Sequence, residues 1–148
     1  MKKFKLGLVL IAFLAVTGAS FASGIGYIDY YKVMDNYDFA QRAIKEVSAK
    51  ELELQQFIID KQKEFKALDT PLKKQTFEQK TAQELKTKEQ ALVTLRTKRE
   101  TEVMNKVKEA AKAVMVEQKL DAVMTQGGIF VGGVDITDMI INKLKGAR

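Results

Sequence analysis

A stretch of about eighty residues without a single glycine dominates this 148-residue sequence. Residues 37–118 contain one proline, Pro71, and no glycine. Glycine and proline are the residues that most weaken or interrupt a helix, so their near absence favours long continuous helices. The one proline predicts that two helices meet near it and reverse direction. We therefore expect a long helical hairpin, which forms an extended arm rather than a globule with an enclosed pocket.

Apolar residues recur at alternating steps of four and three along the first helical segment. Seven of the nine positions in this series are apolar, which predicts a coiled-coil seam with a left-handed supercoil. The exceptions are Glu51 and Lys61, and we expect the stem of Lys61 to follow the seam while its ammonium group reaches water. The nine positions are Ala40, Ile44, Val47, Glu51, Leu54, Ile58, Lys61, Phe65 and Leu68.

The chain is expected to reverse between residues 69 and 75. Thr70 can cap a helix that has Pro71 as its first residue, and Pro71 disfavours a helical Thr70. A later reversal capped by Thr76 is the alternative. The second helix should run over residues 72–118, with burial on more than one side beyond residue 103, where its apolar positions widen. Its apolar stripe is Leu85, Leu92, Leu95, Val103, Val107, Ala110 and Val114.

Short β-like segments flank the helical stretch. Residues 25–30 have the β-branched and aromatic content of a strand. Residues 120–124 and 129–131 have the pattern of two further strands, joined by a hairpin-type turn at residues 125–128. Together these segments predict a three-stranded sheet.

A final short helix is predicted after Gly132 and Gly133. Either Asp135 or Thr137 would cap it. Its packing stripe is Ile136, Ile140 and Leu144. The predicted fold class is therefore α+β and mainly helical, with a long antiparallel helical hairpin on a small three-stranded β body.

The first 22 residues have the pattern of a secretion signal. Three lysines precede an apolar run over residues 6–16, and Ser20-Phe21-Ala22 offers a cleavage site with small residues. The run is shorter than the about 20 residues of a membrane-spanning helix, and a retained anchor is the alternative. We expect a mature chain of one domain over residues 23–148, exported across the inner membrane, without a lipid anchor on cysteine. Its body would comprise residues 23–36 and 119–148, and its arm residues 37–118.

The sequence contains no cysteine, histidine or tryptophan. It therefore has no disulfide framework, no thiol chemistry, no Ser-His or Cys-His nucleophile and no usual general base. Asp29, Asp35, Asp135 and Asp138 could be imagined as a metal or acid–base set. Their spacing matches no calcium loop, however, and helix capping explains the last two. The paired glycines lack the lysine of a phosphate-binding loop. We expect no enzyme, no metal and no cofactor.

Positive charge is concentrated on the distal half of the predicted hairpin. Residues 61–99 hold eleven lysines and arginines and five acidic residues, an excess of six positive charges. The rest of the mature chain carries about three negative charges. The basic half could attract acidic protein surfaces or anionic lipid headgroups. The alternative is an ordinary solvated coiled-coil surface. A three-stranded sheet with two short helices buries little area, so without disulfides we expect the chain to assemble.

Three motifs mark the two ends of the mature sequence. They are Gly26-Tyr27-Ile28-Asp29 with Val33-Met34, Leu120-Asp121-Ala122-Val123-Met124, and Gly132-Gly133-Val134-Asp135-Ile136-Thr137-Asp138. With these motifs the sequence resembles the Skp/OmpH family of periplasmic chaperones. The resemblance implies a jellyfish-like homotrimer with a shared β body and three helical arms around a cavity. Such a protein would hold unfolded outer-membrane proteins in the periplasm without ATP. The arm departs from the family in being interrupted by Pro71 and in having few arginines.

Candidate binding residues follow from this interpretation. Phe57 and Phe77, which lie off the seam or near the tip, are candidates for client contact together with Lys73, Lys74 and Lys80. Phe65 and Leu68 lie on the seam, where core packing is the better interpretation. Arg96, Lys98 and Arg99 are candidates for lipopolysaccharide or another anion, and ion pairing with Glu89, Glu100 and Glu102 is the alternative. Body or trimer contacts are assigned to Tyr27, Ile28, Val123, Ile129 and Val131.

We therefore predict a periplasmic holdase chaperone. A structural coiled-coil protein of the envelope is the alternative. A nucleic-acid partner is not expected, because of the export signal.

Overall fold

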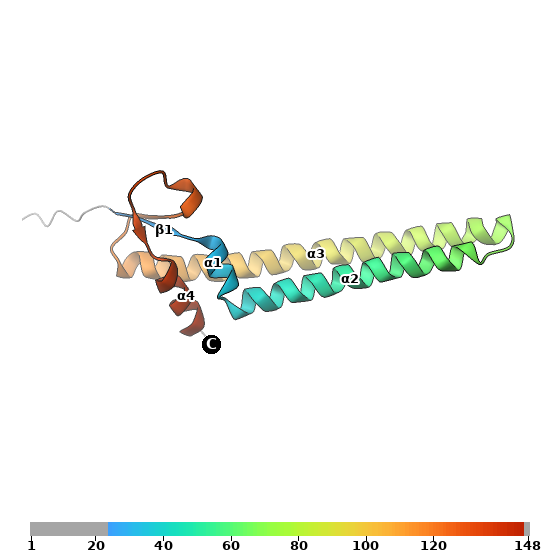
Figure 1. The fold of residues 1–148 in the computed structure, drawn as a ribbon, viewed down its shortest axis with the longest axis horizontal. Coiled ribbons are helices and arrows are strands. Elements are labelled where there is room, and N and C mark those ends of the chain that lie inside the picture. Colours follow the sequence, from blue (N-terminus) through green and yellow to red (C-terminus); the bar gives the residue numbers. More distant parts are fainter. Residues whose placement is uncertain (1–23, 147–148) are drawn as a thin grey trace, which may run out of the picture.

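The computed structural model describes residues 24–146. The predicted signal at residues 1–22 and its cleavage before Ser23 lie outside the described residues. A long two-helix hairpin projects from a small body that contains both ends of the described chain (Figure 1). The predicted fold class, mainly helical with a three-stranded sheet, is confirmed.

The hairpin consists of α2 (Asp38–Lys66) and α3 (Pro71–Glu117). At 1.5 Å per residue, α2 extends about 45 Å and α3 about 70 Å, so α3 continues past the start of α2 into the body. The reversal lies at residues 67–70, slightly before the predicted range of residues 69–75, and it uses the predicted cap. The Thr70 side chain accepts a hydrogen bond of 3.4 Å from the Lys73 amide, and Pro71 is the first residue of α3. Thr76 lies inside the helix, where its hydroxyl donates to the Leu72 carbonyl.

The three strands are β1 (Ile25–Ile28), β2 (Ala122–Thr125) and β3 (Val134–Asp135). The order in the sheet is β2-β1-β3, and both pairs are parallel. The central strand β1 therefore pairs with two strands that lie about a hundred residues further along the chain.

The predicted hairpin between residues 120–124 and 129–131 is wrong. Tight two-residue hairpin turns need positive φ angles, but Gln126–Gly128 forms the short 3-10 helix η1. Among residues 24–146, positive φ angles occur at Lys119, Gly132 and Gly133. The chain therefore turns at Gly132 and Gly133, beyond the expected second strand. β3 then runs parallel to β1 on the edge opposite β2.

The first strand is also shorter than predicted, because it ends at Ile28. The Asp29 carboxylate accepts a hydrogen bond of 3.0 Å from the Lys32 amide and caps an unexpected short helix, α1 (Tyr30–Asp35). Capping by Asp29 therefore outweighs the β propensity of the tyrosines that follow it.

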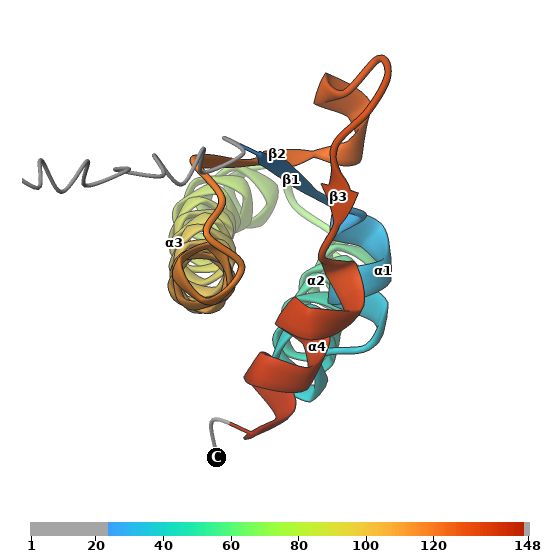
Figure 2. The same ribbon diagram turned by 90° about the vertical axis from the view of Figure 1, so that its left-hand side faces the viewer.

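The last helix of the described chain, α4 (Thr137–Gly146), lies beside α1 in the body (Figure 2). The Asp135 carboxylate accepts a hydrogen bond of 2.9 Å from the Thr137 amide at its start. The predicted packing stripe is confirmed, because Ile136, Ile140 and Leu144 are all buried. Helix α4 packs against both α1 and α3.

The hydrophobic core occupies the body and the base of the hairpin. Its residues are Ile28, Val33, Tyr37, Ala40, Ala43, Val103, Val107, Ala110, Val114, Ile136, Ile140, Ile141 and Leu144. Towards the tip, the seam residues are half-buried, since two helices alone cannot enclose a side chain. Within residues 24–146, no helix combines the length and apolar character needed to cross a membrane.

Candidate functional site

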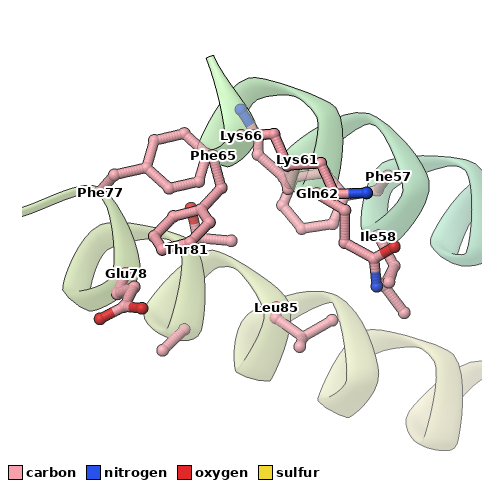
Figure 3. Close-up of a pocket in the computed structure, with 11 residues that line it drawn as sticks. Phe57, Ile58, Lys61, Gln62, Phe65, Lys66, Phe77, Glu78, Thr81 and Leu85 are labelled. Atoms are coloured by element: carbon pink, nitrogen blue, oxygen red, sulfur yellow. The ribbon is translucent and has the colours of Figure 1, made fainter. Parts of the chain in front are cut away.

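A groove of about 340 Å³ opens between α2 and α3 in the distal part of the hairpin (Figure 3). We call it the distal groove. Helix α2 contributes most of its aromatic and cationic side chains, whereas α3 contributes Phe77 and smaller residues. Its lining residues are Phe57, Ile58, Lys61, Gln62, Phe65, Lys66, Phe77, Glu78, Thr81, Ala82 and Leu85.

The groove exists because the seam is poorly filled at this level. Lys61 occupies a seam position on α2, and its ammonium group lies at the edge of the groove, where it pairs with Glu64 at 2.8 Å. On the α3 side, Thr81 and Ala82 are too small to fill the gap left by that lysine. A large apolar residue at either place would close the interface, as large side chains do in ordinary coiled coils. The hairpin therefore keeps an apolar hollow that water can enter.

Three phenylalanine rings line this hollow, and three of the lysines near it lie over their faces. The ring centroids of Phe65 and Phe77 lie 6.2 Å apart, with an interplanar angle of 43°. The Lys61 ammonium lies 5.7 Å from the Phe57 centroid and 5.5 Å from that of Phe77. Both distances from the Lys61 ammonium to a ring centroid are within the range of cation–π attraction.

Two further lysines lie over the same rings. Lys74 lies 5.5 Å from the Phe65 centroid, and Lys88 lies 5.0 Å from that of Phe57. The groove therefore combines an apolar interior with a cationic rim, which suits it to binding apolar and anionic groups.

The predicted client-contact residues divide into two groups. Phe57, Phe77 and Lys74 meet at the distal groove. Lys73 and Lys80 lie outside its lining, and each is close to an acidic residue four positions away in the sequence. Lys73 pairs with Asp69 at 2.9 Å, which lowers the pKa of Asp69, and the Lys80 ammonium lies 3.9 Å from Glu84.

Sequence reasoning missed Phe65, which belongs to the lining, and Lys88, which lies over the Phe57 ring. Phe65 was assigned to core packing, yet it lines the groove and is half-buried. Lys88 was not singled out. Its spacing of three residues from Leu85 and four from Leu92 places it on the predicted stripe of α3, and this spacing could have identified it.

The predicted anion-binding residues lie nearer the middle of the hairpin, where two of them pair with acidic residues. Arg99 donates to both carboxylate oxygens of Glu46 on α2, at 2.7 and 3.0 Å, and to Glu102 at 2.7 Å. Glu46 raises the pKa of Arg99, and Arg99 in turn lowers the pKa of Glu46.

Arg96 pairs across the hairpin with Glu51, one of the charged seam residues. Lys98 is exposed, and no carboxylate in residues 24–146 lies within ion-pair distance of it. Of the three acidic partners expected for these residues, Glu102 pairs with Arg99, whereas Glu89 and Glu100 form no ion pair with them. The other partners are Glu46 and Glu51 of α2.

The residues assigned to the body differ in burial. Ile28 is buried, Val123 packs against the core and Tyr27 is half-buried. Ile129 is half-buried in a loop, and Val131 is 86% exposed. The body also has a larger groove of about 920 Å³, bordered among others by Tyr31, Met104, Met115, Val123 and Met124.

Acidic residues do not gather into a metal site in the part of the chain that the structure describes. Within residues 24–146, no three aspartates or glutamates are arranged so that they could hold a metal ion.

Comparisons with known proteins cover the body and the hairpin together. The family described as "Outer membrane protein (OmpH-like)" matches residues 24–144. A crystal structure of a candidate outer membrane chaperone (OmpH-like) from Caulobacter crescentus is also similar. The two sequences are 13% identical, with 85% of this chain and 86% of that chain covered and a TM-score of 0.43. No curated protein sequence matches this chain.

Proposed function

Because this chain belongs to the OmpH-like family of outer membrane proteins, we propose that it is a holdase chaperone of the periplasm. It would bind unfolded outer-membrane proteins without ATP and keep them soluble. The distal groove is the observation that carries this proposal, since it combines apolar surface with positive charge on an exposed arm. Shallow contacts of this kind suit a protein that must accept many sequences. The proposal involves no catalysis and no cofactor.

We further propose that three copies assemble through the body. A single chain leaves large apolar side chains uncovered there, and a core this small gains stability from association. The exposed large apolar residues of the body are Ile25, Tyr31, Met124, Phe130, Val131, Val134 and Met139. In the trimer their burial would fix three hairpins around one cavity, so that a client meets several distal grooves at once. Such repeated weak contacts raise the overall affinity.

Binding of anionic lipid or lipopolysaccharide by Arg96, Lys98 and Arg99 stays a prediction. Lys98 is the member of this group whose ammonium group is available to a ligand. A ligand at Arg96 or Arg99 would have to compete with Glu51 or Glu46.

Light scattering of a diluted, denatured outer-membrane barrel protein tests the proposed function. We expect the mature chain to suppress aggregation at low salt and to suppress it less well as salt screens the lysines. A structural coiled-coil protein of the envelope would not suppress aggregation of the barrel protein. Aggregation that continues when this chain is in excess would therefore contradict the proposal. A globular protein of similar net charge serves as the control for non-specific attraction.

A further inference from the structure

The distal groove carries lysines that form no ion pair within the described hairpin, although the pKa of the Glu53 carboxyl group is lowered by its ion pair with Lys50 and also by the nearby Lys88. Lys66 belongs to its lining, and Lys74 and Lys88 lie over two of its rings. Within residues 24–146, no carboxylate lies within ion-pair distance of these three lysines. Lys61 differs from them, because it is already paired with Glu64. The rim therefore offers three ammonium groups to an anion brought by a ligand.

The interior of the groove is suited to a single apolar side chain. Its volume of about 340 Å³ lies at the lower end of the roughly 300–1,000 Å³ of ligand pockets. The rings of Phe65 and Phe77 are tilted relative to each other. A third aromatic ring, brought by a ligand, can pack against such a pair in edge-to-face contact. This space is too small for the two acyl chains of a phospholipid. It fits one aromatic ring.

We propose that the distal groove recognises an aromatic residue next to a carboxylate in an extended, unfolded segment. The ring would enter between Phe65, Phe77 and Leu85, and the carboxylate would face the lysines of the rim. This inference rests on the proposed function, because only an unfolded chain presents both groups without a competing fold. Glu78, the only acidic residue among the described lining residues, works against such a ligand.

Fluorescence anisotropy of short labelled peptides tests the proposal with the full mature chain. One peptide has a phenylalanine flanked by two aspartates in a glycine–serine background. In the second peptide the aspartates are lysines, and in the third the phenylalanine is alanine. We expect the first peptide to bind at least about tenfold more tightly than either of the others. Raising the salt from about 0.02 M to about 0.3 M should weaken it.

A variant that fills the groove gives the most direct check. Ala82→Leu places a larger side chain in the hollow, and leucine is nearly as good a helix former as alanine. This variant should lose the preference for the first peptide while keeping its helical circular dichroism. Ala91→Leu is the matched control, since Ala91 lies on the same helix outside the groove.

Charge variants test the contact between the carboxylate and the lysines separately from the contact between the aromatic ring and the groove. Lys74→Gln and Lys88→Gln should each weaken the first peptide roughly threefold, the scale of a partly exposed charge pair. Lys45→Gln, an exposed lysine outside the groove lining, should have no effect. Glu78→Gln should tighten binding.

The outcomes distinguish this inference from the proposed function. If the first peptide binds equally well to Ala82→Leu and to the unaltered chain, the inference is overturned, even where both suppress aggregation. A second result would also overturn the inference. If no peptide binds either the unaltered chain or Ala82→Leu, but phosphatidylglycerol vesicles bind the unaltered chain alone, the groove is a lipid site. Loss of peptide binding in Ala82→Leu, with binding retained in Ala91→Leu, supports it.

Discussion

The backbone amide of Asp29 donates a hydrogen bond of 2.9 Å to the side-chain oxygen of Thr137, 108 residues further along the chain. Asp29 caps α1, and Thr137 is the first residue of α4. The Thr137 side chain is 1% exposed, so water cannot replace this contact from the Thr137 side. The bond therefore joins the beginnings of two helices and helps to fix how the two ends of the chain meet in the body.

Replacing Thr137 by valine should destabilise the body. Valine has nearly the same shape but no acceptor, so the Asp29 amide would lose its partner in a partly buried place. An unsatisfied group of this kind costs about 1–3 kcal/mol of the free energy of unfolding. Urea unfolding at a fixed protein concentration measures the change, because the proposed assembly would make stability depend on concentration. Thr137→Ser, which keeps the hydroxyl, is the control, and equal stability of the two variants would contradict the role of this bond.

A second contact of Thr137, with the carboxylate of Asp135, predicts how stability depends on pH. Hydrogen bonding to the Thr137 side chain, and next to its backbone amide, lowers the pKa of Asp135. A carboxyl group with a lowered pKa in the folded state stabilises the fold above its unfolded value of about 4. This stability is lost as the pH falls through the folded value. Since the chain has no histidine, no side chain with an ordinary pKa titrates between about pH 5.5 and 7.5.

Asp135→Asn separates the charge from the cap. Asparagine still accepts a hydrogen bond from the Thr137 amide, but it does not titrate. We expect the variant to lose less stability than the unaltered chain when the pH is lowered from about 6 to about 3. Urea midpoints measured across this range provide the comparison. The same acid sensitivity in both proteins would show that Asp135 has no part in it.

The sheet also depends on the two glycines before β3. Both have positive φ angles, +82° at Gly132 and +91° at Gly133, which disfavour any other residue. They differ in their surroundings. A Cβ atom on Gly133 would lie 3.2 Å from the Ile25 carbonyl oxygen and 3.1 Å from the Tyr27 ring, whereas Gly132 has open space around it.

We therefore expect Gly133→Ala to lower the free energy of unfolding more than Gly132→Ala. Both variants carry the backbone strain of about 1 kcal/mol or more, but only the first adds a steric conflict between β1 and β3. Thermal unfolding of the two proteins, side by side, measures the difference. Equal losses would mean that the strand shifts to admit the methyl group.

Local chemistry made the hairpin predictable from the sequence. The glycine-free stretch, the seam and the cap at Thr70 each depend on residues a few positions apart, and each is present. The sheet was not predictable in the same way. Alternating apolar residues indicate a strand but not its direction, and both neighbours of β1 come from a distant part of the chain. Residues 129–131 have strand-like side chains, yet no strand within residues 24–146 pairs with them.

The distal groove was predictable only in part. Phe57 and Phe77 could be selected because they lie off the seam or near the tip. Their meeting with Phe65 and Lys88 depends on the register between α2 and α3, which the periodicity of one helix does not contain. Cross-hairpin pairs such as Arg99 with Glu46 help to set that register. A sequence pattern shows that these residues are charged, but it does not show which helix supplies the partner.

The last prediction concerns the proposed assembly through the body. Phe130 is the residue that tests it most directly. The side chain of Phe130 is fully exposed, in the loop between η1 and the glycines that precede β3. An exposed ring beside other apolar side chains is typical of a surface that a partner covers. In the proposed trimer the loop would be buried between chains. Phe130→Asp would then place a charge without a partner in that interface, and such a charge strongly disfavours association.

We expect the unaltered mature chain to have the mass of a trimer by light scattering after size exclusion, and Phe130→Asp to have a smaller mass. The matched control is Val93→Asp, because Val93 is a 64% exposed apolar residue on the arm, away from the body. It should leave the mass unchanged. Because Phe130 contacts little within its own chain, circular dichroism should show the same helical content in all three proteins. A trimer that survives Phe130→Asp, or an unaltered chain that is monomeric at high concentration, would refute assembly through this loop.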